Sequence, residues 1–186
     1  MTLIFSKISP ITSEINQSVS IRRDEIIDNS TEHDIQFKPI DRSNWEDILK
    51  IRVHPSQQMF VPSPVESLAT AYIKPWDEAL DPYAIYLRDT LVGLFYLSYT
   101  PESEDNYWIG GLIIDKEYQG KGIGKKAMTE ILKFIPRKHP QCKIAKLTVE
   151  KDNAVAQNLY KSLGFGDTMS VNRDGEIIYT IVLPTE

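Results

Sequence analysis

The chain has 186 residues, of which 41% are hydrophobic and 25% charged, and its formal net charge is -5. This length and composition predict one globular domain with a sizeable core, and the acidic balance disfavours nucleic acid as the main partner, because duplex binding relies on clustered Lys and Arg. The single cysteine, Cys142, excludes an intramolecular disulfide, and no apolar run reaches the roughly 18–20 residues that span a membrane. With no signal-peptide pattern at the N-terminus, we expect a cytoplasmic enzyme or binding domain.

The first 33 residues differ in composition from the rest of the chain. Ser9–Ser20 is rich in Ser, Thr, Asn and Gln, and a mixed-charge run follows from Arg22 to His33. These stretches have little to bury, so residues 1–33 are expected to form a flexible or weakly docked extension, with a first strand added to the sheet or to a partner as the alternative. The main domain is expected over residues 34–186.

The next segments predict a strand, two short helices and an antiparallel hairpin. Ile35–Ile40 alternates apolar and polar residues, as a half-buried strand does. Two short helices follow on either side of a proline-rich loop, and the second is expected to end at Pro75. Tyr83–Arg88 and Leu91–Tyr99 are rich in β-branched and aromatic residues, which favours two strands joined by a tight turn.

The second half of the chain predicts four more strands and two helices. Tyr107–Ile114 is a strand that contains Gly110-Gly111, a pair that weakens a strand unless a bulge or a closely approaching backbone requires it. A helix begins after Gly122 and is expected to end at Pro136. The remaining elements are a strand at Lys143–Val149, a helix at Asn153–Leu163 and a hairpin of Phe165–Val171 with Ile177–Leu183. The resulting order, β-α-α-β-β-β-α-β-α-β-β, predicts an α/β domain around one mixed sheet.

A glycine-rich turn, Gln119-Gly120-Lys121-Gly122-Ile123-Gly124, connects the central strand to the helix after it. Alternate glycines leave backbone N–H groups uncovered, and the helix start adds unpaired amides and the positive end of its dipole. Together these form a site for phosphate or pyrophosphate oxygens. A Walker loop does not fit, because Gly122 rather than Ser or Thr follows Lys121. A Rossmann fingerprint is disfavoured, because Lys125 stands where its third glycine belongs.

At this turn the chain resembles the GCN5-related N-acetyltransferase (GNAT) superfamily, whose signature of Gln or Arg followed by Gly-x-Gly-x-Gly or Ala is matched by Gln119–Gly124. Asn153–Phe165 is similar to the Asn-x-x-Ala…Leu-Tyr…Gly-Phe segment of the same superfamily. The resemblance covers roughly Ile35 to Leu183. It implies a mixed, mostly antiparallel central sheet with one splayed strand pair and flanking helices.

The resemblance also implies acetyl-CoA as co-substrate and no metal. The pyrophosphate would lie on the glycine turn, and the pantetheine arm would pair with the open edge of Leu112–Ile114, which splays from Lys143–Val149 at Gly110-Gly111. The Ile114 N–H would hold the thioester oxygen as negative charge develops. The implied contacts are Leu112, Ile113, Ile114, Gln119, Gly120, Lys121, Gly122, Ile123, Gly124, Lys125, Asn153 and Tyr160.

The implied reaction is direct transfer of an acetyl group to an amine. The ammonium must lose a proton before it attacks, and the departing thiolate must gain one. Tyr160 matches the usual general acid of the superfamily, since a phenol with a pKa of about 10 is comparable in acidity to a thiol; packing in the core is its alternative role. Glu117 and Glu104 are candidate bases, and Asp105 is a further one.

The expected acceptor is a primary amine of a small cationic molecule, such as a polyamine, because aromatic and acidic residues gather in the segments that shape this side of the superfamily. The expected acceptor contacts are Gln58, Phe60, Tyr99 and Trp108, beside the acidic loop Thr100–Asn106. These segments are also similar to bacterial diamine and spermidine acetyltransferases. The alternatives are a protein or peptide N-acetyltransferase and a non-catalytic CoA-binding sensor. A homodimer is compatible with each.

Overall fold

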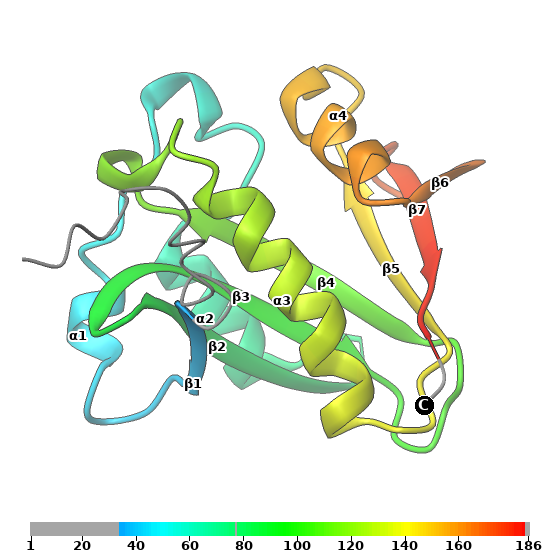
Figure 1. The fold of residues 1–186 in the computed structure, drawn as a ribbon, viewed down its shortest axis with the longest axis horizontal. Helices are drawn as coiled ribbons and strands as arrows, with labels where there is room; N and C mark the ends of the chain where they lie inside the picture. Colours follow the sequence, from blue (N-terminus) through cyan, green and yellow to red (C-terminus); the bar gives the residue numbers. More distant parts are fainter. Residues whose placement is uncertain (1–33, 77, 185–186) are drawn as a thin grey trace, which may run out of the picture.

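The structure is a computed structural model that describes residues 34–76 and 78–184, so the expected extension lies outside the described residues. Seven strands form one sheet in the order β1-β2-β3-β4-β5-β7-β6. Within the described part, β4 and β5 are parallel and every other neighbouring pair is antiparallel. Helices flank this sheet (Figure 1), which confirms the predicted fold class.

The elements follow in the predicted order. The strands are β1 (Ile35–Pro39), β2 (Ala79–Leu87), β3 (Thr90–Tyr99), β4 (Tyr107–Ile114), β5 (Ile144–Val149), β6 (Gly166–Val171) and β7 (Ile177–Val182). The α-helices are α1 (Trp45–Ile48), α2 (Pro64–Ile73), α3 (Ile123–Lys138) and α4 (Ala154–Ser162), with 3₁₀ turns η2 (Pro55–Gln57) and η3 (Lys116–Tyr118). No helix of the described residues is long and apolar enough to cross a membrane.

The end predicted for α3 was wrong. The helix continues through Pro136 to Lys138. A proline in the last turn removes the single N–H that would bond to the carbonyl four residues earlier, and the His139 N–H still donates to the Ile135 carbonyl over 2.8 Å. The helix therefore closes its last turn despite the proline.

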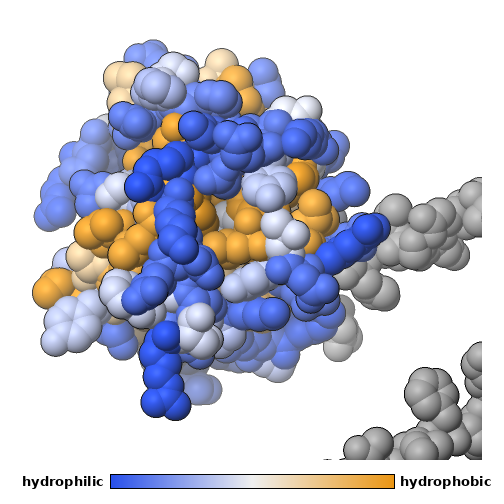
Figure 2. Space-filling view, turned by 90° about the vertical axis from the view of Figure 1, so that its left-hand side faces the viewer, coloured by the Kyte–Doolittle hydropathy of each residue, from blue (hydrophilic) through white to orange (hydrophobic). Residues whose placement is uncertain are grey.

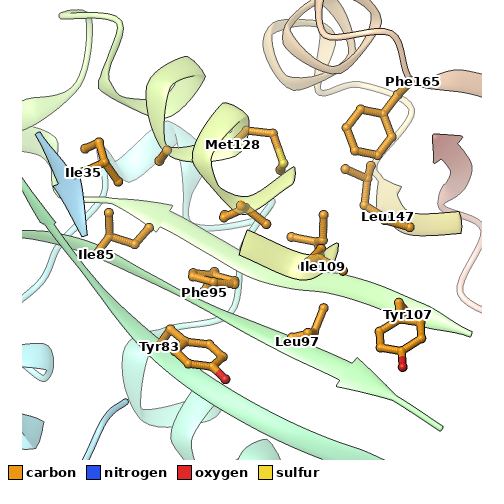
Figure 3. Packing of buried hydrophobic residues seen from close by; sticks show 14 of the residues in the cluster. Ile35, Tyr83, Ile85, Phe95, Leu97, Tyr107, Ile109, Met128, Leu147 and Phe165 are labelled. Atoms are coloured by element: carbon orange, nitrogen blue, oxygen red, sulfur yellow. The ribbon is translucent and has the colours of Figure 1, made fainter. Parts of the chain in front are cut away.

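Two apolar clusters lie on opposite faces of the sheet. The larger packs between the sheet and α3 and includes Phe95, Ile109 and Met128 (Figure 3). The smaller includes Ile48 and Leu94 and packs beneath α1 and α2. From the α1 side, a band of apolar surface is bordered by hydrophilic residues (Figure 2). Because side chains alternate along a strand, successive residues of β3 and β4 face either α3 or α2.

The parallel strands β4 and β5 separate soon after they begin. Tyr107 pairs with Ala145 and Trp108 with Lys146, and no later pair joins the two strands within the described residues. Figure 1 shows the strands diverging between α3 and α4, and β5 instead continues its pairing with β7. The edge of β4 beyond Trp108 is therefore open, which confirms the predicted splayed strand pair.

The glycine pair in β4 has a second role that the sequence did not indicate. The pairing of β3 with β4 is irregular between Leu94 and Tyr96, and Gly111 has φ +57°. A Cβ atom at Gly110 would lie 2.2 Å from Cε2 of Tyr96, and one at Gly111 would lie 2.7 Å from Cε1 of the same ring. Only glycine at both positions lets the Tyr96 ring lie across β4.

Candidate active site

The glycine turn between β4 and α3 presents unpaired amides to open space. Gly120 and Gly122 have φ +72° and +75°, which favours glycine, and a Cβ at either position would meet nothing within 4 Å. Among the described residues, no backbone carbonyl accepts a hydrogen bond from the N–H groups of residues 120–125. The turn therefore has the uncovered donors that a pyrophosphate needs.

Positive side chains surround these amides. The first turn of α3 contains no acidic residue but carries Lys125 and Lys126, although a cation near a helix N-terminus costs about 0.3–1 kcal/mol. The ammonium of Lys121 donates to the Glu117 carbonyl over 2.8 Å, which holds it at the same turn. An anionic ligand would turn this unfavourable arrangement into a favourable one.

The turn is connected to the open end of β4. Gln119 Nε2 donates to the Ile114 carbonyl over 2.8 Å, while the N–H of the next residue, Asp115, donates to Val92 on β3 over 2.8 Å. Because N–H and C=O of one strand residue point to the same side, the Ile114 N–H faces away from β3. Leu112 and Ile114 pack on the α3 face, and Ile113 is buried on the α2 face.

Helix α4 places a half-buried phenol beside the splay. The Asn153 carboxamide accepts from the Ala156 N–H over 3.1 Å and caps the helix. Further along, Tyr160 packs against Phe165, with ring centroids 5.7 Å apart. Burial raises the pKa of Tyr160 to about 12, so the phenol is protonated at neutral pH. No described side chain makes a hydrogen bond to its hydroxyl.

The two candidate bases lie at opposite ends of β4. Glu104 precedes the strand, where its carboxylate pairs with Lys143 over 2.7 Å and its side chain is 60% exposed. Glu117 follows the strand in η3, with its side chain 75% exposed and 4.0 Å from the Lys116 ammonium. The structure therefore does not bring these two carboxylates into one centre.

The predicted acceptor residues also fall into separate places. Trp108 lies on the α2 face of the sheet, where its Nε1 donates to Asn106 over 2.7 Å. Tyr99 lies on the α3 face, stacked on Tyr107 with ring centroids 5.4 Å apart. Gln58 is exposed and Phe60 is half-buried, in the loop before α2.

Other residues on the α2 face were not predicted as site residues. Tyr96 lies on the Gly110-Gly111 backbone, and burial, with a further contribution from the Glu176 charge, raises the pKa of its phenol. Ser67 on α2 is 1% exposed, and its hydroxyl has no hydrogen-bond partner among the described residues. The alternation of β3 and β4 could have placed Tyr96 on the face of Trp108, but nothing in the sequence marks Ser67.

Glu78, just before β2, is a further unpredicted residue on this side. Its carboxylate accepts from Ser98 Oγ over 2.5 Å and from Asn106 Nδ2 over 2.8 Å. Asn106 is also the residue that holds Trp108, so the carboxylate and the indole belong to one hydrogen-bonded group. Its partners lie 20 and 28 residues away, and no local pattern reveals such a group.

The described fold thus has an open strand that ends in a glycine turn with uncovered amides. The family model described as Acetyltransferase (GNAT) family matches residues 43–165. The chain belongs to this family and is an N-acetyltransferase.

Similar proteins agree with this assignment. The chain is 30% identical over 151 residues to a probable spermine N(1)-acetyltransferase of Bacillus subtilis subsp. natto, covering 76% of this chain and 94% of the relative. It is 29% identical, with the same coverage, to the spermine/spermidine N(1)-acetyltransferase of Bacillus subtilis strain 168. The spermidine N-acetyltransferase of Vibrio cholerae, solved with CoA and spermine, superposes with a TM-score of 0.62 at 17% identity, over 82% of this chain and 97% of that one. This last likeness shows the fold alone.

Proposed function

We propose that the enzyme transfers the acetyl group of acetyl-CoA directly to a primary amine of a small polycationic acceptor such as a polyamine. The observation that carries the proposal is the glycine turn, with its uncovered amides and lysines, at the end of an open strand. The acceptor class is supported by the two spermine-acetylating relatives at 30% and 29% identity.

The donor would be held by backbone and charge. Its pyrophosphate would take the N–H groups of residues 120–125, with Lys121 and Lys125 balancing the phosphate charge. Its pantetheine arm would hydrogen-bond to the free edge of β4 at Leu112–Ile114, as an added strand does. Asn153 would contact the same arm from the start of α4.

In the reaction, the neutral amine attacks the thioester carbonyl carbon, and negative charge develops on the carbonyl oxygen. The Ile114 N–H donates to that oxygen. Collapse of the intermediate breaks the carbon–sulfur bond, and Tyr160 gives its proton to the thiolate. The extra proton on the newly bonded nitrogen then passes to the Tyr160 phenolate through water, which restores the phenol and leaves the neutral amide. Glu117 lies at the end of β4 nearest the Ile114 N–H, and its mostly exposed carboxylate would take the proton of the ammonium through water.

The proposal is tested by thiol release from acetyl-CoA across a panel of spermine, spermidine, amino acids, aminoglycosides and N-terminal peptides. Release with the polyamines, at higher kcat/KM than with the other classes, is the expected result. Turnover with peptides alone would assign the enzyme to protein acetylation. CoA binding without turnover of any amine would indicate a sensor instead.

A further inference from the structure

The carboxylate of Glu78 has capacity for a ligand. It accepts hydrogen bonds from Ser98 and Asn106, and both donors are neutral. No Lys, Arg or His in the described part of the chain lies within ion-pair distance of it. An ionised carboxylate has about four lone-pair sites, so two remain for a cationic donor.

The surface between Glu78 and the splay is aromatic. Trp108 lies opposite Ser98 on β3 and is held by Asn106, which also holds Glu78. Tyr96 lies across the glycine backbone of β4 on the same face. Aromatic faces attract ammonium groups and pack against methylene chains. We call Glu78, Trp108 and Tyr96 the acceptor row.

The end of the acceptor row near the reaction centre has an unsatisfied polar group. A Cβ at Gly111 would lie 3.3 Å from the Ser67 hydroxyl, which is buried and has no partner among the described residues. A buried hydroxyl without a hydrogen bond costs stability, so a ligand group or water at this place would stabilise it.

The row has a length that suits a molecule with two separated nitrogens. At about 3.3 Å per residue, Trp108 lies about 10 Å along β4 from Gly111. Lys146 places its ammonium 5.4 Å from the Trp108 ring centroid on the β5 side, whereas Glu78 approaches from the β2 side. The carboxylate of Glu78 therefore attracts a cation at its end of the acceptor row.

We propose that Glu78 binds a second, non-reacting ammonium of the acceptor, whose methylene chain lies over Trp108 and Tyr96. The inference rests on the proposed function and names its substrate class: amines that carry another cationic nitrogen several carbons from the one that is acetylated. Glu78 acts on acceptor affinity and takes no part in the chemical step.

The test compares Glu78→Gln with the wild type on spermidine and on butylamine, which has no second nitrogen. The variant keeps the shape of the side chain and removes its charge. The KM for spermidine should rise roughly 10- to 100-fold with kcat within about twofold, while kcat/KM for butylamine stays within about twofold. Glu130→Gln is the matched control, because Glu130 pairs with Lys133 and Arg137 on α3, and it should leave both substrates unchanged.

Titration calorimetry of spermidine into the enzyme with CoA provides a readout independent of turnover, and the variant should bind more weakly by the same factor. An unchanged KM and affinity for spermidine in Glu78→Gln would overturn the inference. Equal losses for spermidine and butylamine, with a lowered Tm, would instead make Glu78 a structural residue. The inference would also be overturned if the enzyme preferred lysine to spermidine and the Lys146→Gln variant weakened that preference.

Wild-type enzyme that acetylates butylamine and spermidine equally well would refute the Glu78 subsite alone, whereas no turnover of any amine would refute the proposed function.

Discussion

Replacing Tyr160 with Phe removes one oxygen atom from the place where the thiolate would depart. In the folded chain the phenol has a pKa of about 12. Against a free thiol with a pKa of about 8.5, proton transfer from this phenol would be uphill by roughly 5 kcal/mol. A general acid whose pKa exceeds that of the departing thiol by this much would contribute little to the rate.

Burial acts on thiols as well, and Cys142 illustrates the direction of this effect. Burial raises the pKa of the Cys142 thiol to about 11. A CoA sulfur in a comparably desolvated site would differ from Tyr160 by about one pKa unit, which corresponds to about 1.4 kcal/mol. The acidities of phenol and thiol are then again comparable, as general acid catalysis needs.

The Tyr160→Phe variant should therefore lose roughly 10²- to 10⁴-fold in kcat, which is roughly 3–5.5 kcal/mol of activation free energy. Its KM for acetyl-CoA should change by less than about threefold. Because no described side chain bonds to the hydroxyl, the free energy of unfolding should change by less than about 1 kcal/mol.

The assay is steady-state thiol release at saturating acetyl-CoA and amine, with Tm measured on the same preparations. An unchanged kcat would show that Tyr160 is not the general acid. A fall in kcat accompanied by a clear fall in Tm would show that the hydroxyl serves packing. The pH profile provides a second check. A phenol with a pKa of about 12 is protonated throughout the range below about pH 11, so no loss of kcat in that range should be traceable to Tyr160.

Three further outcomes are expected. Gly110→Ala should lower the free energy of unfolding by about 1–3 kcal/mol in denaturant titration, because the added Cβ meets the Tyr96 ring at 2.2 Å; a similar loss in a Tyr96→Ala background would contradict this reason. The double variant Lys125→Glu with Lys126→Glu should raise the KM for acetyl-CoA by roughly tenfold or more at low salt, and an unchanged KM would remove the anion role of this turn. Burial is the main cause that lowers the pKa of His139, and the positive charge of Lys138 is the second, so the folded state disfavours protonation of this imidazole. Stability should thus fall as pH drops from about 6.5 toward that lowered pKa and level off below it; a His139→Gln variant should lack this part of the pH dependence in thermal melts.

The structural features that match the sequence-based predictions depend on local patterns. The glycine turn is a run of neighbouring residues whose backbone needs can be read directly, since positive φ and uncovered amides require glycine at fixed positions. The boundaries of β4 were also predicted, because its apolar run is bounded by a polar loop and by Asp115. The splayed pair came from the family resemblance, not from the residues of the strand.

The acceptor side was harder to predict because it depends on register and long-range contacts. Tyr99 and Trp108 are both aromatic and close in sequence, but Ser98 is the residue that pairs with Trp108, so Tyr99 faces the opposite side of the sheet. A shift of one residue in pairing would exchange the faces. The position of Glu78 has no local sequence signal, because its two hydrogen-bond partners come from β3 and from the loop after it.

The central claim is acetyl transfer from acetyl-CoA to a polyamine, and mass spectrometry of the reaction products tests it most directly. With wild-type enzyme, acetyl-CoA and spermidine, we predict mono-acetylated spermidine and free CoA in a 1:1 ratio. The Tyr160→Phe variant should form both products at the same ratio and at a rate lower by roughly 10²-fold or more. Free CoA without acetylated spermidine, or no CoA release at all with this acceptor, would contradict the account.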